Sequence, residues 1–189
     1  CQSLCGTAPN PSCLPAAQAK LQADEKTAGK EKLQLQWKKI APATTRASFG
    51  DPVTGNTVAV ACVFDDGGAF VGEYLVDRGS QTCDGKPCWK LTGKEGYAYS
   101  DKTASASGIA KMKFAGGDPN KGQAAAQGKN DAGKGLSSLP TGLVGALTDA
   151  GLRPSVVNGG GTGSLGWSSR DASLTEVCVG SGFLGATLF

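Results

Sequence analysis

The sequence predicts an all-β fold, a disulfide-stapled β-sandwich of short, mainly antiparallel strands. Three observations support this prediction. Glycine accounts for 29 of the 189 residues and aromatics for only 6%, a composition that favours turns and short strands over long packed helices. Several segments alternate apolar and polar residues with a period of two, as a strand with one buried face does. Seven cysteines occur without a single histidine, which favours disulfides over zinc sites.

The chain divides into an N-terminal arm, residues 1–31, and a main domain, residues 32–189. The arm begins with CQSLCGTAPNPSC, whose cysteines and prolines predict an irregular stapled segment that acts as an anchor or cap. From Pro15 to Lys30 the composition favours a short helix, with Pro15 at its start and Gly29 at its end. Because the apolar stripe of this helix is narrow, a solvated, extended spacer is the other interpretation.

The main domain shows its strands as alternating segments. Leu33, Leu35 and Trp37 alternate with polar residues and give the clearest strand. Further strands are predicted at residues 97–99 and 108–114, and a β-hairpin at residues 56–64 and 69–76, which flank the turn Asp65-Asp66-Gly67-Gly68.

The sequence beyond residue 115 contains fewer large side chains. Residues 115–138 are mostly Gly, Ala, Lys, Asn and Ser and predict a long surface hairpin, with a weak strand at 123–127. Residues 141–150 fit a turn of helix, and an alternation resumes at Leu165 and Trp167 after three glycines.

The stretch TCDGKPCWK places Cys83 and Cys88 on either side of a four-residue turn. A zinc site would need two further soft ligands nearby, and the remaining cysteines are isolated in the sequence. A redox pair has two intervening residues and opens a helix, whereas Gly85 and Pro87 favour a turn. A disulfide needs only that the two Cα atoms approach each other, so a Cys83–Cys88 staple is the prediction.

Two further bridges complete the predicted cysteine scheme. Cys62 and Cys178 lie in the apolar, strand-like segments VACVF and EVCVG, and Cys5 and Cys13 form a local pair. In the chain-entropy model a Cys62–Cys178 bridge would contribute about 5 kcal/mol because it closes most of the domain, against roughly 2 kcal/mol for the short staple. The sequence alone leaves the connectivity open.

Cys1 is the seventh cysteine and the first residue. A first residue other than methionine indicates that a secretory signal was removed, which predicts an extracellular or cell-surface location. Cys1 is either lipidated, as in bacterial lipoproteins, or paired with Cys5, Cys13 or another chain. A lipid on Cys1 is the only membrane attachment expected, since no apolar run has spanning length.

Composition and spacing exclude several classes of function. The net charge of +3 is spread thinly, and no basic block is interleaved with aromatics, so no nucleic acid is expected as a partner. The absence of histidine excludes His-based triads. The carboxylates of Asp65 and Asp66 would point to opposite faces of a strand, and those of Glu73 and Asp77 lie too far apart for a retaining pair. We therefore expect no enzyme activity, cofactor or metal.

The run CDGKPCWK, residues 83–90, is followed by GYAYSDK at residues 96–102. This pattern resembles a poorly characterised domain of secreted bacterial proteins that carries GKPCWK, then KGxxYxDK, a Gly-Ile strand, a Gly/Lys-rich hairpin, a Leu-Pro turn and a late cysteine. In this sequence the Gly-Ile strand corresponds to residues 107–109 and the Gly/Lys-rich hairpin to residues 122–129. The Leu-Pro turn corresponds to residues 139–140, and the late cysteine is Cys178. The resemblance implies an extracellular β domain and brings no catalytic residues.

The C-terminal segment VCVGSGFLGATLF, residues 177–189, contains no charged residue. Left exposed, such a segment would aggregate. It is predicted to be either an internal core strand or a strand donated to a neighbouring subunit. In the second case the subunit-contact residues are Phe183, Leu184, Ala186, Leu188 and Phe189.

These patterns predict a structural subunit of an extracellular filament or cell-surface assembly, a homopolymer whose contacts include β-strand addition. The alternative is a secreted carbohydrate- or surface-binding β-sandwich. In that alternative the ligand would be held by Trp89, Trp167, Tyr97 and Tyr99, residue types that also commonly serve as core or hairpin partners.

Overall fold

A computed structural model describes the chain at residues 4–8, 10, 13–24, 29–64, 70–131, 134–135 and 157–159. Its regular elements are almost all strands, with one short 3-10 helix, η1 (Arg46–Phe49). The strands are β1 (Ala16–Asp24), β2 (Lys32–Ile40), β3 (Ala59–Phe64), β4 (Phe70–Val76), β5 (Thr82–Cys83), β6 (Lys86–Pro87), β7 (Trp89–Thr92), β8 (Gly96–Ser100), β9 (Ile109–Ala115), β10 (Gly122–Asp131), β11 (Lys134–Gly135) and β12 (Val157–Gly159).

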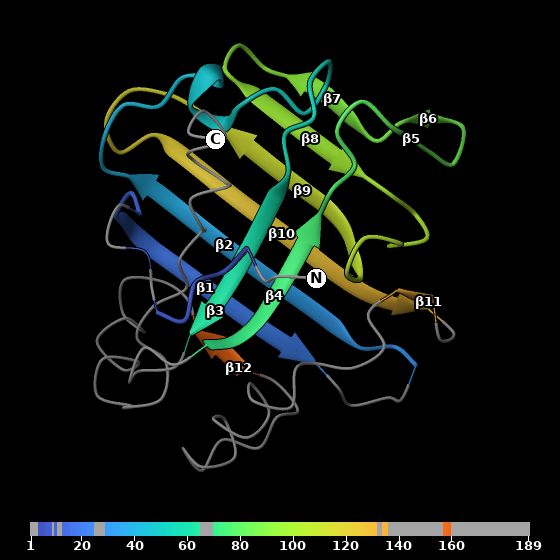
Figure 1. Cartoon of the computed structure of the whole chain (residues 1–189). Helices are drawn as coiled ribbons and strands as arrows, with labels where there is room; N and C mark the ends of the chain where they lie inside the picture. Colours follow the sequence, from blue (N-terminus) through green and yellow to red (C-terminus); the bar gives the residue numbers. More distant parts are fainter. Residues whose placement is uncertain are drawn as a thin grey trace.

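Eight of these strands form one sheet, which we call the large sheet. Its order is β12-β1-β2-β10-β9-β8-β7, with β11 paired to β10, and the pairs are antiparallel. The hairpin β3–β4 is a separate two-stranded sheet that runs across one face of the large sheet (Figure 1). The predicted all-β sandwich is confirmed, with one layer much larger than the other.

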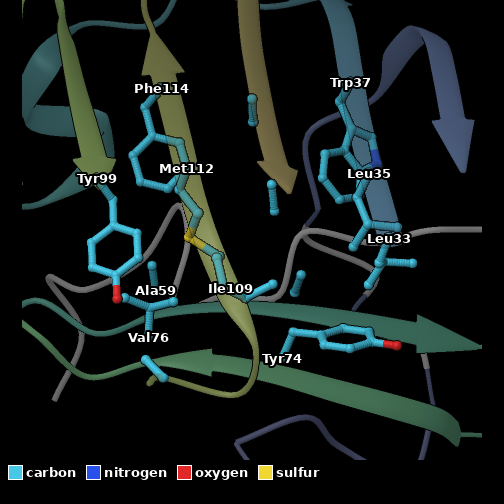
Figure 2. Packing of buried hydrophobic residues seen from close by; sticks show 14 of the residues in the cluster. Leu33, Leu35, Trp37, Ala59, Tyr74, Val76, Tyr99, Ile109, Met112 and Phe114 are labelled. Atoms are coloured by element: carbon cyan, nitrogen blue, oxygen red, sulfur yellow. The ribbon is translucent and has the colours of Figure 1, made fainter. Parts of the chain in front are cut away.

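The main core lies between the large sheet and the β3–β4 hairpin. Side chains of β2 and β9 point toward β3 and β4, where Ala59, Tyr74 and Val76 meet them (Figure 2). The apolar side chains of the large sheet form rows that cross it in register. One row consists of Leu21, Leu35, Ala126, Met112, Tyr99 and Trp89, and the next of Ala19, Trp37, Ala124, Phe114 and Tyr97.

A second, smaller core covers the opposite face of the hairpin. Val60, Cys62 and Phe64 of β3 cluster with Cys5, and Cys13 packs against them. The N-terminal segment therefore forms a third layer, and this explains why all six residues of β3 are buried. A strand buried on both faces is expected to be continuously apolar, as AVACVF is.

Residues 16–24 are extended as strand β1, so the helix considered for residues 15–30 is wrong. β1 pairs with β2 along its length, in the same sheet and across the expected boundary at residue 31. Its buried residues, Leu21 and Ala23, alternate with polar ones. Helix propensities differ by only a few tenths of a kcal/mol per residue, and a full ladder of backbone hydrogen bonds overrides them.

Strand β10 corrects the expectation of a weak strand in a surface hairpin. It is ten residues long and pairs with β2 on one side and β9 on the other. Its buried Ala126 lies between Leu35 and Met112 in register. The neighbouring strands supply the large side chains that β10 lacks. The other predicted strands and the β3–β4 hairpin are present at their expected places.

Candidate interaction surfaces

The face of the large sheet that points away from the hairpin, here called the outer face, is polar. One row crosses five strands in register as Gln22, Gln34, Gln127, Lys111 and Ser100. These side chains are exposed or half-buried. They alternate along each strand with the buried residues of the main core, as the pleat of a strand requires.

Lysine and glutamine dominate the outer face. Its described lysines are Lys20, Lys32, Lys38, Lys90, Lys111, Lys113 and Lys129, and its described glutamines are Gln18, Gln22, Gln34, Gln36, Gln123 and Gln127. Asp24 is the one acidic residue among the described outer-face side chains. The fold therefore gathers positive charge that is dispersed along the sequence.

The outer face is hollowed where β1, β2, β10, β9 and the end of β8 lie side by side. The hollow has a volume of about 490 Å³, within the range of small-molecule sites. Four lysines line it, Lys32, Lys102, Lys111 and Lys129. Three glutamines of the row described above also line it, together with Asp24 and Asp101.

Asp101 holds together the turn beside this hollow. Its side chain accepts hydrogen bonds from the backbone N–H groups of Thr103 (2.9 Å) and Ser105 (2.7 Å), from both hydroxyls of these residues (2.7 Å each) and from Tyr99 Oη (3.3 Å). Asp101 is only 2% exposed. Burial acts to raise its pKa, but the hydrogen bonds from Ser105 and Thr103 outweigh burial and lower the pKa to about 2.

The tyrosine and aspartate of the sequence pattern YxDK therefore have a structural role. Burial raises the pKa of Tyr99, and Asp101 adds to the shift, so the phenol keeps its proton and donates to Asp101. The backbone N–H of Lys102 donates to Asp84 Oδ2 at 3.0 Å. This bond links the turn to the loop between Cys83 and Cys88.

The cysteines give one predicted bridge and one different pairing. Cys83 and Cys88 form the predicted disulfide, with a Cα–Cα distance of 4.8 Å. Cys5 bonds to Cys62, with a Cα–Cα distance of 5.7 Å, so the predicted pairs Cys62–Cys178 and Cys5–Cys13 are wrong. The reason is that the N-terminal segment folds over β3 and brings Cys5 to Cys62. Cys13 is also disulfide-bonded.

Three of the four aromatics considered for ligand binding belong to the core. Trp89, Tyr97 and Tyr99 are between 1% and 4% exposed. Trp89 stacks on Phe114 with ring centroids 5.5 Å apart. These rings cannot present a face to a sugar, so ligand binding through them is wrong. Trp167 lies outside the described residues.

The carboxylates considered for catalysis have other partners. Glu73 accepts a hydrogen bond from the backbone N–H of Cys5 at 3.0 Å, and Asp77 pairs with Arg78 at 2.8 Å. Asp65 and Asp66 lie outside the described residues, as do Cys1, Cys178 and the C-terminal segment Phe183–Phe189. In the described part of the chain, no three His, Cys, Asp or Glu residues are grouped so that they could hold a metal ion.

One edge of the large sheet is only partly paired. β12 pairs with Leu21, Gln22 and Ala23 of β1, and no described strand pairs with residues 16–20 on that side. The Asn130 N–H donates to Glu31 O at 2.8 Å, so the odd-numbered residues of β2 bond to β10 and its even-numbered residues bond to β1. Gln18 and Lys20 are the partners of Lys38 and Gln36 and bond to β2, so between them the backbone N–H and C=O of Ala19 point away from β2.

The opposite edge of the sheet has the features that discourage strand addition. β7 is four residues long and carries the exposed Lys90, and short edge strands with lysine are common protections. β1 is longer, and the unpaired part has one lysine at its end. The β1 edge is therefore the better candidate for accepting another strand.

No protein-family model, curated protein or solved structure matches this chain. The resemblance to a domain of secreted bacterial proteins consequently stays a prediction. The disulfides indicate an oxidising environment outside the cytoplasm. No helix among the described residues is both long and apolar enough to cross a membrane.

Proposed function

We propose that the chain is a structural, non-catalytic subunit of an extracellular filament or cell-surface assembly, and that copies of it join by β-strand addition. The partly unpaired edge of β1 is the observation that carries this proposal. Outward-pointing N–H and C=O groups on alternate residues are what an added strand needs for its backbone hydrogen bonds.

Two disulfides in the described part of the chain favour a stable subunit. Cys5–Cys62 holds the N-terminal segment on the hairpin, and Cys83–Cys88 closes the loop before β7. In the chain-entropy model the first bridge, with a sequence separation of 57 residues, contributes about 4 kcal/mol, and the second roughly 2 kcal/mol. Such stabilisation suits a protein that works outside the cell.

The strand that we expect to be donated is the apolar C-terminal segment Phe183–Phe189. Its alternating faces are both apolar, so solvent exposure disfavours leaving this segment unpaired. A donor at one end of the chain and an acceptor at β1 make a heterologous contact, which repeats into an open filament unless the rotation closes a ring.

The test blocks the acceptor edge without breaking the sheet. In Ala19→Pro the N–H that points away from β2 is removed, while the ladder to β2 keeps its bonds, because proline is tolerated at such edge positions. Ala19→Val is the matched control, since it adds a side chain of similar size at the same place and keeps the N–H. Circular dichroism verifies that both variants are folded.

Negative-stain microscopy of the full chain should show filaments for the wild type and Ala19→Val, and discrete particles for Ala19→Pro. Deletion of residues 183–189 should also give discrete, folded particles. Filaments of undiminished length in Ala19→Pro, or a wild type that forms only discrete particles, would contradict the proposal.

A secreted carbohydrate-binding module is the second candidate, and the hollow in the outer face is the observation that favours it. The two functions use different parts of the large sheet, its edge and its face.

A further inference from the structure

The outer face of the large sheet carries an excess of positive charge. The described outer-face side chains of its strands include seven lysines and one aspartate, although the whole chain has a net charge of only +3. In the lining of the hollow, four lysines outnumber the two carboxylates, Asp24 and Asp101. A surface lined by one sign of charge raises the local concentration of oppositely charged partners, most of all where it is concave. The hollow between β1 and β8 is such a place.

The arrangement of these lysines brings like charges together on neighbouring strands. Lys32 and Lys129 lie directly opposite each other in the register of β2 and β10, and like charges in that position repel. Asp24, opposite Lys32 on the other side, offsets part of this repulsion. Packing gives no reason for the pair, since the side chains of this face are not part of either core. An anionic partner would be attracted by both ammonium groups and would offset the repulsion between them.

The glutamines indicate the chemical class of that partner. Gln22, Gln34 and Gln127 line the hollow beside the lysines, and each amide both donates and accepts hydrogen bonds. The ammonium groups of the lysines form ion pairs with carboxylates, and the amides of the glutamines form hydrogen bonds with hydroxyls. A ligand that carries both groups at short repeats is a polymer of acidic sugars.

Other polyanions fit this face less well. Single-stranded nucleic acids bind on aromatic side chains that stack with the bases, and the described outer-face side chains include none. Binding at an anionic membrane commonly adds bulky apolar side chains that enter the lipid, and these too are absent from that set. The same lack of aromatic rings disfavours neutral sugars, which commonly stack on such rings.

We propose that the outer face of the large sheet binds an acidic polysaccharide, and that the hollow lined by Lys32, Lys102, Lys111 and Lys129 holds its uronate groups. This site is independent of the β1 edge and of the assembly proposed above. It places ligand binding on a face that the buried aromatics do not reach.

The test measures binding of the full chain to polygalacturonate by isothermal titration calorimetry at low ionic strength. Lys32→Gln/Lys111→Gln removes two exposed lysines of the hollow. Lys86→Gln/Lys94→Gln is the matched control, because it removes two exposed lysines elsewhere and changes the net charge equally. We expect the first pair to weaken binding about fivefold or more and the control pair to change it less than twofold.

Further comparisons define the partner. Dextran, a neutral polysaccharide, should not bind measurably, and binding of polygalacturonate should weaken as salt is added. Ala19→Pro, whose side chain lies on the core side of the sheet, should bind as the wild type does, so that a failure of assembly and a failure of ligand binding are told apart. Equal binding by the two double variants, no binding by the wild type, or tighter binding to single-stranded DNA or to phosphatidylglycerol vesicles would overturn the proposal.

Discussion

Strands β2, β10 and β9 in the centre of the large sheet and strands β7 and β8 at its end are stabilised by different interactions. In the centre, Trp37 and Phe114 lie on either side of Ala124 in register, and all three are buried in the main core. At the end, Cys83–Cys88 and the hydrogen bonds of Asp101 fix the turns that flank β7 and β8. Apolar burial dominates the first region, and covalent and polar links are added in the second.

The difference follows from the number of neighbours that each region has. A central strand is paired on both sides and covered by the hairpin that crosses it (Figure 1), so small residues suffice on β10. Among the described strands, β7 has a neighbour on one side only. Its Trp89 is buried against Tyr99 and Phe114, but the chain around it must be held by links that do not depend on a second neighbour.

Removal of a large side chain from the centre should have the greatest effect. Trp37→Ala should lower the free energy of unfolding by about 3–5 kcal/mol, because it leaves a cavity beside Ala124 that the hairpin cannot fill. Urea denaturation measures this. Gln36→Ala, the next residue on β2 but on the outer face, should change stability by less than about 0.5 kcal/mol. Similar losses in both variants would mean that the two faces are not distinguished by packing.

An added side chain in the centre should have a smaller effect. Ala126→Leu should destabilise by about 1–3 kcal/mol, since the added atoms have no space between Leu35, Met112 and the hairpin. Ala125→Leu adds the same atoms to the outer face of β10 and should be nearly neutral. If thermal unfolding shows Ala126→Leu to be as stable as the wild type, the small residues of β10 are not required by the hairpin.

At the sheet end, the stability should depend on pH through Asp101. Its pKa is about 2 in the folded protein and near 3.9 in an unfolded chain. The carboxylate therefore contributes about 2 kcal/mol above pH 4, and the contribution is lost as the pH falls toward 2. Asp101→Asn should be less stable than the wild type at neutral pH by roughly this amount, and the gap should narrow in acid.

The control for this measurement is Asp118→Asn, on an exposed turn, which should leave stability within about 0.5 kcal/mol. Urea denaturation at several pH values gives the comparison. A gap between Asp101→Asn and the wild type that stays constant down to about pH 2.5 would show that the charge of Asp101 is not what stabilises the turn.

The sequence predicts those strands whose own side chains show a period of two. In β2 and β9 large apolar residues alternate with lysine and glutamine, and both were expected. β1 has the same alternation, but its core-facing residues include the half-buried Ala19 and the buried Ala23, small side chains that give a weak apolar signal and favour helices. β10 has alanine and glycine at most of its buried positions, so its place in the centre depends on neighbours that the local sequence does not reveal.

Long-range contacts account for the other differences. The Cys83–Cys88 pair is set by a local turn, whereas the Cys5–Cys62 pair depends on how the N-terminal segment crosses β3, and spacing carries no information about that. The basic outer face was missed for the same reason. Its lysines are separated along the chain and become neighbours only through the register of six strands. Their alternation with apolar residues was the available signal.

The Cys5–Cys62 bond also places the N-terminal segment and the basic outer face on opposite sides of the molecule. It fixes residues 4–8 on the side of the hairpin that is turned away from the large sheet, so the hairpin and the whole sheet separate these residues from the lysines. Anything tethered through this segment would present the basic surface outward, facing the surroundings instead of the tether.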